Sequence, residues 1–244
     1  MKILGIIPAR YASTRFPGKP LVDIGGKSMI QRVYEQSKKC ADLAEVLVAT
    51  DDERIYDHVI KFGGKAIMTS SNHQSGTDRC AEVALQYPEY DTIINIQGDE
   101  PFIDPQQISI LASCFKSADT QIATLVKKVL TEQELLNTNS PKVLVNLLSE
   151  AIYFSRSPLP HIRGQEQQNW LNYYTYFKHI GIYGYRADVL QLITKLPVSS
   201  LEKAESLEQL RWIENGYCIK VAETELETFA VDTPEDLEKL IFDV

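Results

Sequence analysis

The segment ILGIIPARYASTRFPGKP, residues 3 to 20, decides the fold of this chain. It opens with an apolar run, Ile3 to Ile7, and continues through three prolines towards Gly25-Gly26. A short apolar run that ends at prolines and glycines is typical of a buried strand that enters a loop. The prolines also exclude a helix, because proline lacks the N–H that a helix interior needs. The segment therefore predicts a first strand followed by a long loop.

A helix and a second strand are expected after this loop. Five residues recur at the spacing that places them on one helical face: Met29, Ile30, Val33, Tyr34 and Ser37. Glu45 to Thr50 then has the short apolar run of a buried strand. Strand, helix and strand together form a βαβ unit, from which parallel sheets are built.

The same alternation continues through the first half of the chain. A helix at 53–62 is expected to end at Gly63-Gly64, because glycine favours helix C-termini. A strand at 66–69, a helix at 78–86 and a strand at 92–96 are expected to follow. This order predicts an α/β fold with a doubly wound, mainly parallel, Rossmann-like sheet. The ligand site of such a sheet lies beyond the carboxyl ends of its strands.

The second half is less regular and predicts a small β-rich elaboration. A hairpin is expected around Ser149-Glu150, although neither residue is the Gly or Asn that a tight turn prefers. The length of 244 residues favours one domain over 1–244. The expected elements are hairpin strands at 142–148 and 151–154, a loop at 161–172, a strand at 178–185, a helix at 201–214 and a helix beginning at Thr233-Pro234.

Composition and charge exclude several classes of protein. The 25 Lys and Arg against 33 Asp and Glu give a net charge of -8, which opposes general attraction to nucleic acid or to an anionic membrane. The apolar run at Ile3 to Ile7 meets Pro8 too early for the h-region of a signal peptide, and no apolar run approaches the length of a membrane span, so neither element is expected. The separated cysteines predict reduced, mostly buried thiols in a cytoplasmic protein: Cys40, Cys80, Cys114 and Cys218.

Three cations lie in the loop that follows the first strand, namely Arg10, Arg15 and Lys19. Cations along an extended loop can follow a triphosphate, on which charge builds during attack at the α-phosphate. A solvated basic loop is the alternative, and the place at a strand end favours phosphate binding. Two other phosphate loops are excluded, because Leu21 stands where a P-loop needs its first glycine and no GxGxxG follows the first strand.

Two acids are candidate ligands of magnesium. Asp99 follows the predicted strand at 92–96 directly, and Asp232 follows the apolar run Phe229-Ala230-Val231. Magnesium prefers oxygen ligands and is commonly shared between one or two carboxylates and substrate phosphates. Helix capping is the alternative for both acids, and for Asp232 taken alone it has the greater weight.

Several blocks in this sequence closely resemble the 3-deoxy-manno-octulosonate (Kdo) cytidylyltransferase family. They are spread over nearly the whole chain in the order of the family, so together they are more specific than any one motif. The blocks are IPARYASTRFPGKPL at 7–21, HQSGTDR at 73–79, QGDEP at 97–101, YFSR at 153–156, HIGIYGYR at 179–186, LEQLR at 207–211 and VDTPEDL at 231–237.

This resemblance implies the nucleotide-diphospho-sugar transferase fold and transfer of CMP from CTP to Kdo, for lipopolysaccharide synthesis. It implies a nucleotide-binding half at about 1–130, a sugar-binding and dimerisation half at about 131–244, and a homodimer. It assigns catalysis to Arg10, Lys19, Asp99 and Asp232, with the two acids holding Mg²⁺. By the same resemblance the nucleotide is bound by Ala9, Arg10, Ser13, Arg15, Lys19, Ser75, Gly76 and Gln97, and the sugar by Arg79, Arg156, His179, Tyr185, Glu208 and Gln209.

Some positions depart from the family pattern. Asp78 stands where many relatives have Glu, and Asn146 where an acid is expected. His161 to Gly164 replaces a more acidic or aromatic stretch. These differences concern the sugar side and leave the nucleotide chemistry intact.

Three other functions compete with this interpretation. A related enzyme could activate sialic acid or an amino derivative of Kdo, which substrate screening separates. An inactive nucleotide-sensing module would lose the metal-binding acids, whereas Asp99 and Asp232 are both present. A glycosyltransferase would be expected to carry a DxD motif, which neither Asp99-Glu100-Pro101 nor Asp51-Asp52-Glu53 supplies.

Overall fold

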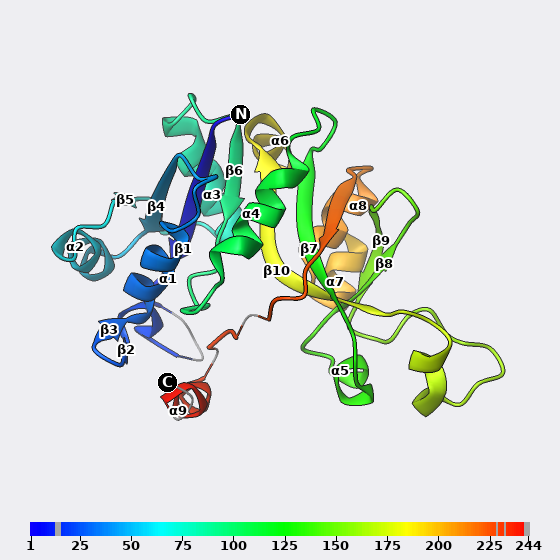
Figure 1. The fold of residues 1–244 in the computed structure, drawn as a ribbon. Helices are drawn as coiled ribbons and strands as arrows, with labels where there is room; N and C mark the ends of the chain where they lie inside the picture. Colours follow the sequence, from blue (N-terminus) through cyan, green and yellow to red (C-terminus); the bar gives the residue numbers. More distant parts are fainter. Residues whose placement is uncertain (13–15, 228, 232, 242–244) are drawn as a thin grey trace.

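The computed structural model describes residues 1–12, 16–227, 229–231 and 233–241. A central sheet carries helices on both faces (Figure 1). The strands are β1 (Ile3–Ala9), β2 (Asp23–Ile24), β3 (Lys27–Ser28), β4 (Glu45–Thr50), β5 (Ala66–Met68), β6 (Thr92–Asn95), β7 (Ile122–Lys128), β8 (Lys142–Val145), β9 (Ala151–Ser155), β10 (Phe177–Arg186) and β11 (Ile219–Glu223). The helices are α1 (Met29–Ser37), α2 (Glu53–Lys61), α3 (Gly76–Gln86), α4 (Pro105–Cys114), α5 (Glu132–Leu136), α6 (Ala187–Ile193), α7 (Ser200–Glu205), α8 (Gln209–Glu214) and α9 (Pro234–Ile241), with 3-10 helices at Lys19–Leu21 and Gln167–Asn172.

The main sheet has the strand order β11-β7-β10-β6-β1-β4-β5, and β8 and β9 extend it beside β10. β1 is parallel to β4 and β6, β4 is parallel to β5, and β11 is parallel to β7. β10 runs antiparallel to both β6 and β7. The predicted doubly wound, mainly parallel sheet is therefore confirmed, with β10 as an antiparallel insertion. The sequence patterns did not predict β7 or β11.

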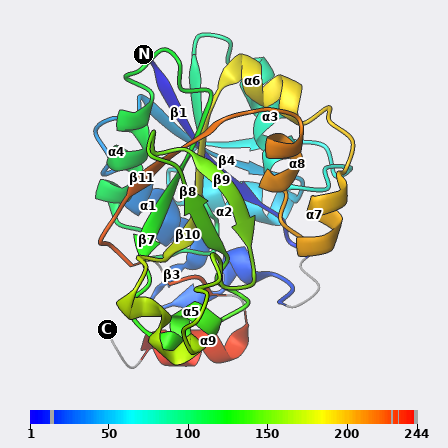
Figure 2. The ribbon, with the colours of Figure 1, turned by 90° about the vertical axis from the view of Figure 1, so that its right-hand side faces the viewer.

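Side chains of β1 alternate between the two cores of the sheet. Leu4 and Ile6 pack with α3, α6 and α8, whereas Ile3 and Ile7 pack with α1, α2 and α4. All four side chains are at most 1% exposed. Burying an aliphatic side chain of this size contributes about 2 kcal/mol. Figure 2 shows α4 on one side of the sheet and α3, α6 and α8 on the other. The strand is thus fixed from both faces, and so is the direction of the loop that leaves it.

The predicted hairpin is present as β8 and β9, which pair antiparallel. β8 ends at Val145, three residues before the predicted end. Asn146 closes the turn, because its Oδ1 accepts hydrogen bonds from the backbone N–H groups of Leu148 and Glu150, both at 2.9 Å. Ser149 takes a positive φ of 57° in the place where glycine was missing. The side chain of Asn146 thus stabilises a turn that has no glycine at its left-handed position.

The prediction of a single helix at 201–214 is wrong. Two helices, α7 and α8, occupy this range and are separated at Ser206, whose φ of 52° is left-handed. A residue in this conformation ends a helix, because it cannot continue the right-handed turn. Leu207 is buried beyond the break. The break changes the chain direction directly before Glu208, one of the predicted site residues.

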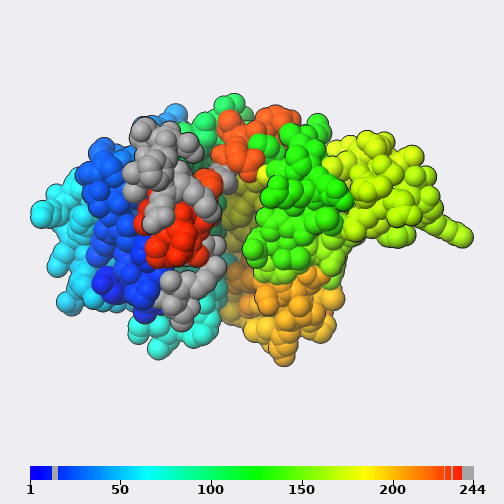
Figure 3. All heavy atoms as spheres, turned by 90° about the horizontal axis from the view of Figure 1, so that it is seen from below, coloured from blue at the N-terminus to red at the C-terminus, as the bar shows by residue number. Residues whose placement is uncertain are grey.

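The predicted loop at 161–172 also needs a correction. Its last six residues form a 3-10 helix around buried Trp170, whose indole N–H donates to the carbonyl of Gln165 at 3.1 Å. The helix expected from Thr233-Pro234 is confirmed as α9, and Thr233 N–H donates to the carboxylate of Asp236 at 3.0 Å. Leu237 of α9 packs with Ile24 and Val231. Seen from below, the molecular surface is hollowed between the part that carries α9, in red, and the green and orange segments of α5 and α7 (Figure 3).

The four cysteines form no disulfide, as predicted. Cys40 and Cys80 are buried, Cys114 is partly exposed and Cys218 is exposed, so the expectation of burial is wrong for Cys218. Among the residues that the structure describes, no helix is both long and apolar enough to cross a bilayer.

Candidate active site

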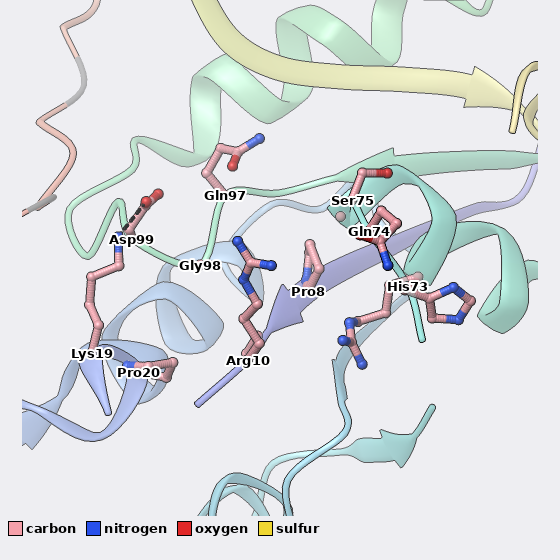
Figure 4. A pocket seen from close by; sticks show the side chains of 13 residues that line it. Pro8, Arg10, Lys19, Pro20, His73, Gln74, Ser75, Gln97, Gly98 and Asp99 are labelled. Carbon is pink, nitrogen blue, oxygen red and sulfur yellow. Dashed lines mark hydrogen bonds and ion pairs between the residues drawn. The ribbon is translucent and has the colours of Figure 1, made fainter. Parts of the chain in front are cut away.

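A pocket of about 250 Å³ lies at the carboxyl ends of β1 and β6, where the fold predicts a ligand site (Figure 4). The end of β1, the first 3-10 helix, the start of α3 and the loop after β6 each supply part of its wall. Eight residues predicted from the sequence line it: Ala9, Arg10, Lys19, Ser75, Gly76, Arg79, Gln97 and Asp99. Five lining residues were not among the predicted site residues: Pro8, Pro20, His73, Gln74 and Gly98.

Lys19 and Asp99 meet across this pocket. Lys19 Nζ lies 2.7 Å from Asp99 Oδ2 and donates to the carbonyl of Val231 at 2.9 Å. The N–H of Val231 in turn donates to the carbonyl of Asp99 at 2.9 Å. The segment before α9 is therefore bound directly to the loop after β6. Asp232, the second predicted metal ligand, lies outside the described residues, as do the predicted nucleotide-binding residues Ser13 and Arg15.

The basic loop is folded back by backbone contacts. Gly18 N–H donates to the carbonyl of Tyr11 at 3.0 Å, and Gly18 has a φ of 74° that suits glycine. The guanidinium of Arg54 stacks 3.4 Å from the Tyr11 ring. Lys19 is thereby held towards the pocket, whereas Arg10 is exposed. Figure 4 shows Arg10 between Pro8 and the loop that carries Gly98 and Asp99.

The start of α3 forms another wall of the pocket. Ser75 Oγ accepts from the N–H of Asp78 at 3.1 Å, and the Asp78 carboxylate accepts from the N–H of Ser75 at 3.2 Å. Asp78 therefore completes a capping box with Ser75, in which its carboxylate reaches back to the backbone of the cap residue. The positive end of the α3 dipole consequently faces the pocket, which favours an anionic ligand.

The loop after β6 approaches β1 very closely. A Cβ on Gly98 would lie 2.9 Å from the carbonyl oxygen of Pro8, a separation that side chains do not tolerate. Gln97 Nε2 donates to the carbonyl of Gly181 in β10 at 2.8 Å. Glu100 points away into the protein and is buried, and burial together with neighbouring Asp99 raises the pKa of Glu100 to about 8. Asp99 is thus the carboxylate of this pair that faces the pocket.

Arg79 lines the same pocket and is bound to the protein. Its guanidinium lies 3.2 Å from a carboxylate oxygen of Asp51 and also contacts the hydroxyl of Thr69. The side chain is only 4% exposed. The structure therefore groups Arg79 with the predicted nucleotide residues, although the resemblance assigned it to the sugar.

A second polar cluster begins one residue beyond Gly76. Thr77 Oγ1 donates to Glu208 Oε2 at 2.8 Å, and burial raises the pKa of Glu208. Tyr185 is fully buried and Gln209 nearly so. Within the described part of the chain, the hydroxyl of Tyr185 and Nε2 of Gln209 have no hydrogen-bond partner. Three predicted sugar-binding residues thus share one cluster, and its unpaired polar atoms suit a ligand rich in hydroxyl groups.

His179 lies at the edge of this cluster. Its ring packs between Phe154 and Tyr183, with ring centroids 5.2 and 5.1 Å away. Tyr183 in turn stacks on Tyr185 at 6.0 Å. Burial lowers the pKa of His179 to about 4, so its imidazole is neutral near pH 7. Neither Thr77 nor Tyr183 was predicted from the sequence, because each gains its place only through contacts with distant residues.

Arg156 is held away from the pocket by backbone carbonyl groups. Its guanidinium donates to Glu205 at 2.7 Å, to Thr138 at 3.0 Å and to Ser206 at 3.3 Å. These bonds secure the break between α7 and α8, which leads into Glu208. The structure thus shows Arg156 supporting the second cluster, and its predicted contact with the sugar stays a prediction.

The donor set at Asp99 suits a hard cation. Its carboxylate is 26% exposed and offers oxygen atoms at the pocket wall. Among the described residues, no group of three His, Cys, Asp or Glu side chains could hold a metal ion. Magnesium does not require such a group, because it commonly keeps waters and substrate phosphates as its other ligands.

Known proteins share this architecture and most of this sequence. A family model described as Cytidylyltransferase matches residues 4–229. The chain is 61% identical to a 3-deoxy-manno-octulosonate cytidylyltransferase of Parabacteroides distasonis, with 99% of this chain and 97% of that protein covered. It is 53% identical to the protein of that name from Fusobacterium nucleatum, with 99% and 96% covered.

A solved structure gives the same result for the fold. The structure of CMP:2-keto-3-deoxy-manno-octonic acid synthetase complexed with CTP superposes with a TM-score of 0.91 at 47% sequence identity. The superposition covers 99% of this chain and 98% of that chain. The pocket at β1 and β6 therefore sits in a nucleotidyltransferase fold, and this chain belongs to the cytidylyltransferase family, among the 3-deoxy-manno-octulosonate cytidylyltransferases.

Proposed function

We propose that this chain transfers CMP from CTP to the anomeric hydroxyl of Kdo, releases pyrophosphate and supplies the activated sugar for lipopolysaccharide synthesis. The observation that carries this proposal is one pocket in which Arg10, Lys19 and Asp99 face the N-terminus of α3. The adjoining cluster of Tyr185, Glu208 and Gln209 offers hydrogen bonds to a polyhydroxylated acceptor. The names of the relatives, and the CTP in the related complex, support the same pair of substrates.

The bond changes are those of a nucleotidyl transfer. The anomeric oxygen forms a bond to the α-phosphorus of CTP, and the bond from that phosphorus to the bridging oxygen of pyrophosphate breaks. The hydroxyl proton passes to solvent. Negative charge grows on the leaving pyrophosphate, so cations at Arg10 and Lys19 stabilise the transition state more than the ground state. Alignment and electrostatics supply most of the catalysis in such reactions.

A magnesium ion belongs to this proposal, with Asp99 and Asp232 as its protein ligands. When bound it neutralises charge on the phosphate oxygens. Asp99 fits this role because its carboxylate faces the pocket, whereas neighbouring Glu100 is buried. Lys19 reaches the same carboxylate and can hold it in place for the metal.

The proposal includes a homodimer in the cytoplasm. The tip of the β8–β9 hairpin and its outer strand expose Leu147, Leu148 and Ile152, and Leu148 is 67% exposed. Apolar side chains grouped at a sheet edge in this way favour association with a partner. Light scattering on the purified protein gives the mass of the particle and tests the dimer directly.

The reaction is tested by measuring the pyrophosphate that the purified protein releases from CTP in the presence of magnesium. The acceptor is Kdo, sialic acid or an amino derivative of Kdo, and one sample contains no sugar. UTP, ATP and GTP serve as controls for the base. Release that needs both CTP and Kdo is the expected result. Release with another sugar would overturn Kdo as the proposed acceptor. No release with any pair of nucleotide and sugar would favour a nucleotide-binding module without catalytic activity.

A further inference from the structure

Thr124 lies in β7, opposite Tyr183 and beside an irregularity in the neighbouring strand β10. The pairing register of β10 with β7 shifts between Ile180 and Tyr183, so the carbonyl groups around Gly181 are displaced from a regular ladder. Thr124 Oγ1 lies 2.8 Å from the carbonyl oxygen of Ile182 and 3.3 Å from that of Ile180. The same hydroxyl lies 2.9 Å from His179 Nε2. One buried hydroxyl thus serves both the irregular strand and the imidazole.

The hydrogen atoms at this point can be counted. A carbonyl oxygen only accepts hydrogen bonds, and a hydroxyl has one hydrogen to donate. We assign the hydrogen of Thr124 to the shorter contact, the carbonyl of Ile182. With this assignment Thr124 offers a lone pair to His179, and His179 Nε2 carries the hydrogen of that bond. In a neutral imidazole the other nitrogen, Nδ1, is then an acceptor.

We propose that Thr124 is a positioning residue that holds His179 as the Nε2–H tautomer, with the lone pair of Nδ1 left to accept a hydrogen bond from a hydroxyl of the sugar. This rests on the proposed function, which places His179 at the sugar. It makes His179 an acceptor for a hydroxyl group and excludes it as the cation that pairs with the sugar's carboxylate. Thr124 bonds to Nε2, and no residue in the described part of the chain forms a hydrogen bond with Nδ1.

The surroundings of His179 support this assignment. The ring is wedged between Phe154 and Tyr183, which fixes its plane. Burial lowers the pKa of His179 to about 4, so one neutral tautomer has to be chosen near pH 7. The irregular part of β10 is also tied to the nucleotide pocket, because Gln97 donates to the carbonyl of Gly181 at 2.8 Å. The orientation of His179 is therefore set by the strand that borders both substrates.

The tautomer can be observed by nuclear magnetic resonance without catalysis. Histidine labelled with ¹⁵N gives distinct shifts for a protonated and an unprotonated ring nitrogen, and a long-range ¹H–¹⁵N spectrum links them to the ring protons. The chain has four histidines, so the His179 signals are assigned by their loss in His179→Asn. The wild-type protein is expected to show protonated Nε2 and unprotonated Nδ1 at neutral pH. Protonated Nδ1 with bare Nε2 overturns the proposal.

Three variants test the part played by Thr124. Thr124→Val keeps the shape and removes the hydroxyl, Thr124→Ser keeps the hydroxyl, and Thr92→Val is the matched control. Thr92 is buried in β6, on the other side of β10 from β7, and its hydroxyl bonds to Asp91 and Arg186 instead of a histidine. Thr124→Val is expected to show both tautomers of His179, and Thr124→Ser and Thr92→Val the wild-type one. A single Nε2–H tautomer in Thr124→Val overturns the role of Thr124.

Kinetics connect the tautomer to the sugar. Thr124→Val is expected to raise the KM for Kdo about tenfold and to leave the KM for CTP near the wild-type value, as loss of one well-placed acceptor predicts. Thr124→Ser is expected to restore the KM for Kdo. An unchanged KM for Kdo in Thr124→Val overturns the link to the sugar. If no sugar supports turnover of the wild-type enzyme, the proposed function fails, while the NMR result still decides the tautomer.

Discussion

Lys19 Nζ lies 2.7 Å from Asp99 Oδ2, although 80 residues separate them in the chain. The pair joins the loop after β1 to the loop after β6, and the bond from Lys19 to Val231 adds the segment before α9. Three loops that meet at the ammonium group of Lys19 give this pocket a defined shape.

Asp99→Asn is expected to lower turnover by at least about 10³-fold, because it removes the charge that would hold magnesium and orient Lys19. Asparagine has the same shape, and the ion pair is partly exposed, so the free energy of unfolding should fall by only about 1 kcal/mol. Turnover is measured by pyrophosphate release and stability by urea denaturation.

The matched control is Asp104→Asn, which removes a carboxylate from the same loop at the cap of α4. Asparagine is an equally good cap, so this variant should retain both activity and stability. Near-normal turnover in Asp99→Asn would refute its metal role.

Gly98→Ala is expected to destabilise the fold by about 2 kcal/mol, because its Cβ would lie 2.9 Å from the carbonyl oxygen of Pro8 and backbone must move. Gly181→Ala is the control, since a Cβ there meets no atom within 4 Å. The comparison of their midpoints in urea measures the close approach of β1 and the loop after β6. Equal midpoints would show that β1 and the loop after β6 can move apart without a loss of stability.

Strands and helices with their own apolar pattern could be predicted from sequence. β1 and β4 are continuous apolar runs, and the buried face of α1 recurs at helical spacing. β7 was not predicted from the sequence, because this strand depends largely on its pairing with β10 and β11. The break between α7 and α8 also escaped, because a left-handed Ser206 has no signal in the local pattern.

The same distinction applies to the site. Residues at strand ends, such as Arg10 and Asp99, could be chosen from the sequence because parallel strands bring their carboxyl ends to one edge. Thr77 and Thr124 could not, since an isolated threonine carries no pattern. Their partners, Glu208 and His179, lie 131 and 55 residues further along the chain. Only the folded structure brings these hydroxyl groups to the site.

Ser75→Ala is expected to cost about 1 kcal/mol of stability and to raise the KM for CTP about fivefold, because it removes the cap that orients the start of α3. Ser199→Ala is the control, since Ser199 forms the same capping box on α7, whose residues do not line the pocket. Both variants should lose similar stability, and only Ser75→Ala should bind CTP less tightly. An equal KM for CTP in the two variants would separate the cap from nucleotide binding.

Stability should also depend on pH through His179. Its pKa is lowered to about 4 in the folded protein, against an ordinary value of 6.5, so between these values the unfolded chain binds a proton that the folded protein does not. The free energy of unfolding therefore falls as the pH drops through this window, by up to about 3 kcal/mol. The predicted loss of stability can be measured against a variant without the imidazole.

His179→Gln removes this titration, and the carboxylates common to both proteins cancel in the difference between their free energies of unfolding. Urea denaturation of both proteins at several pH values should give plots of unfolding free energy against pH that converge as the pH falls, because the wild type loses stability faster. Parallel curves would mean that the folded protein does not lower the pKa of His179 and that its imidazole protonates as readily as in the unfolded chain.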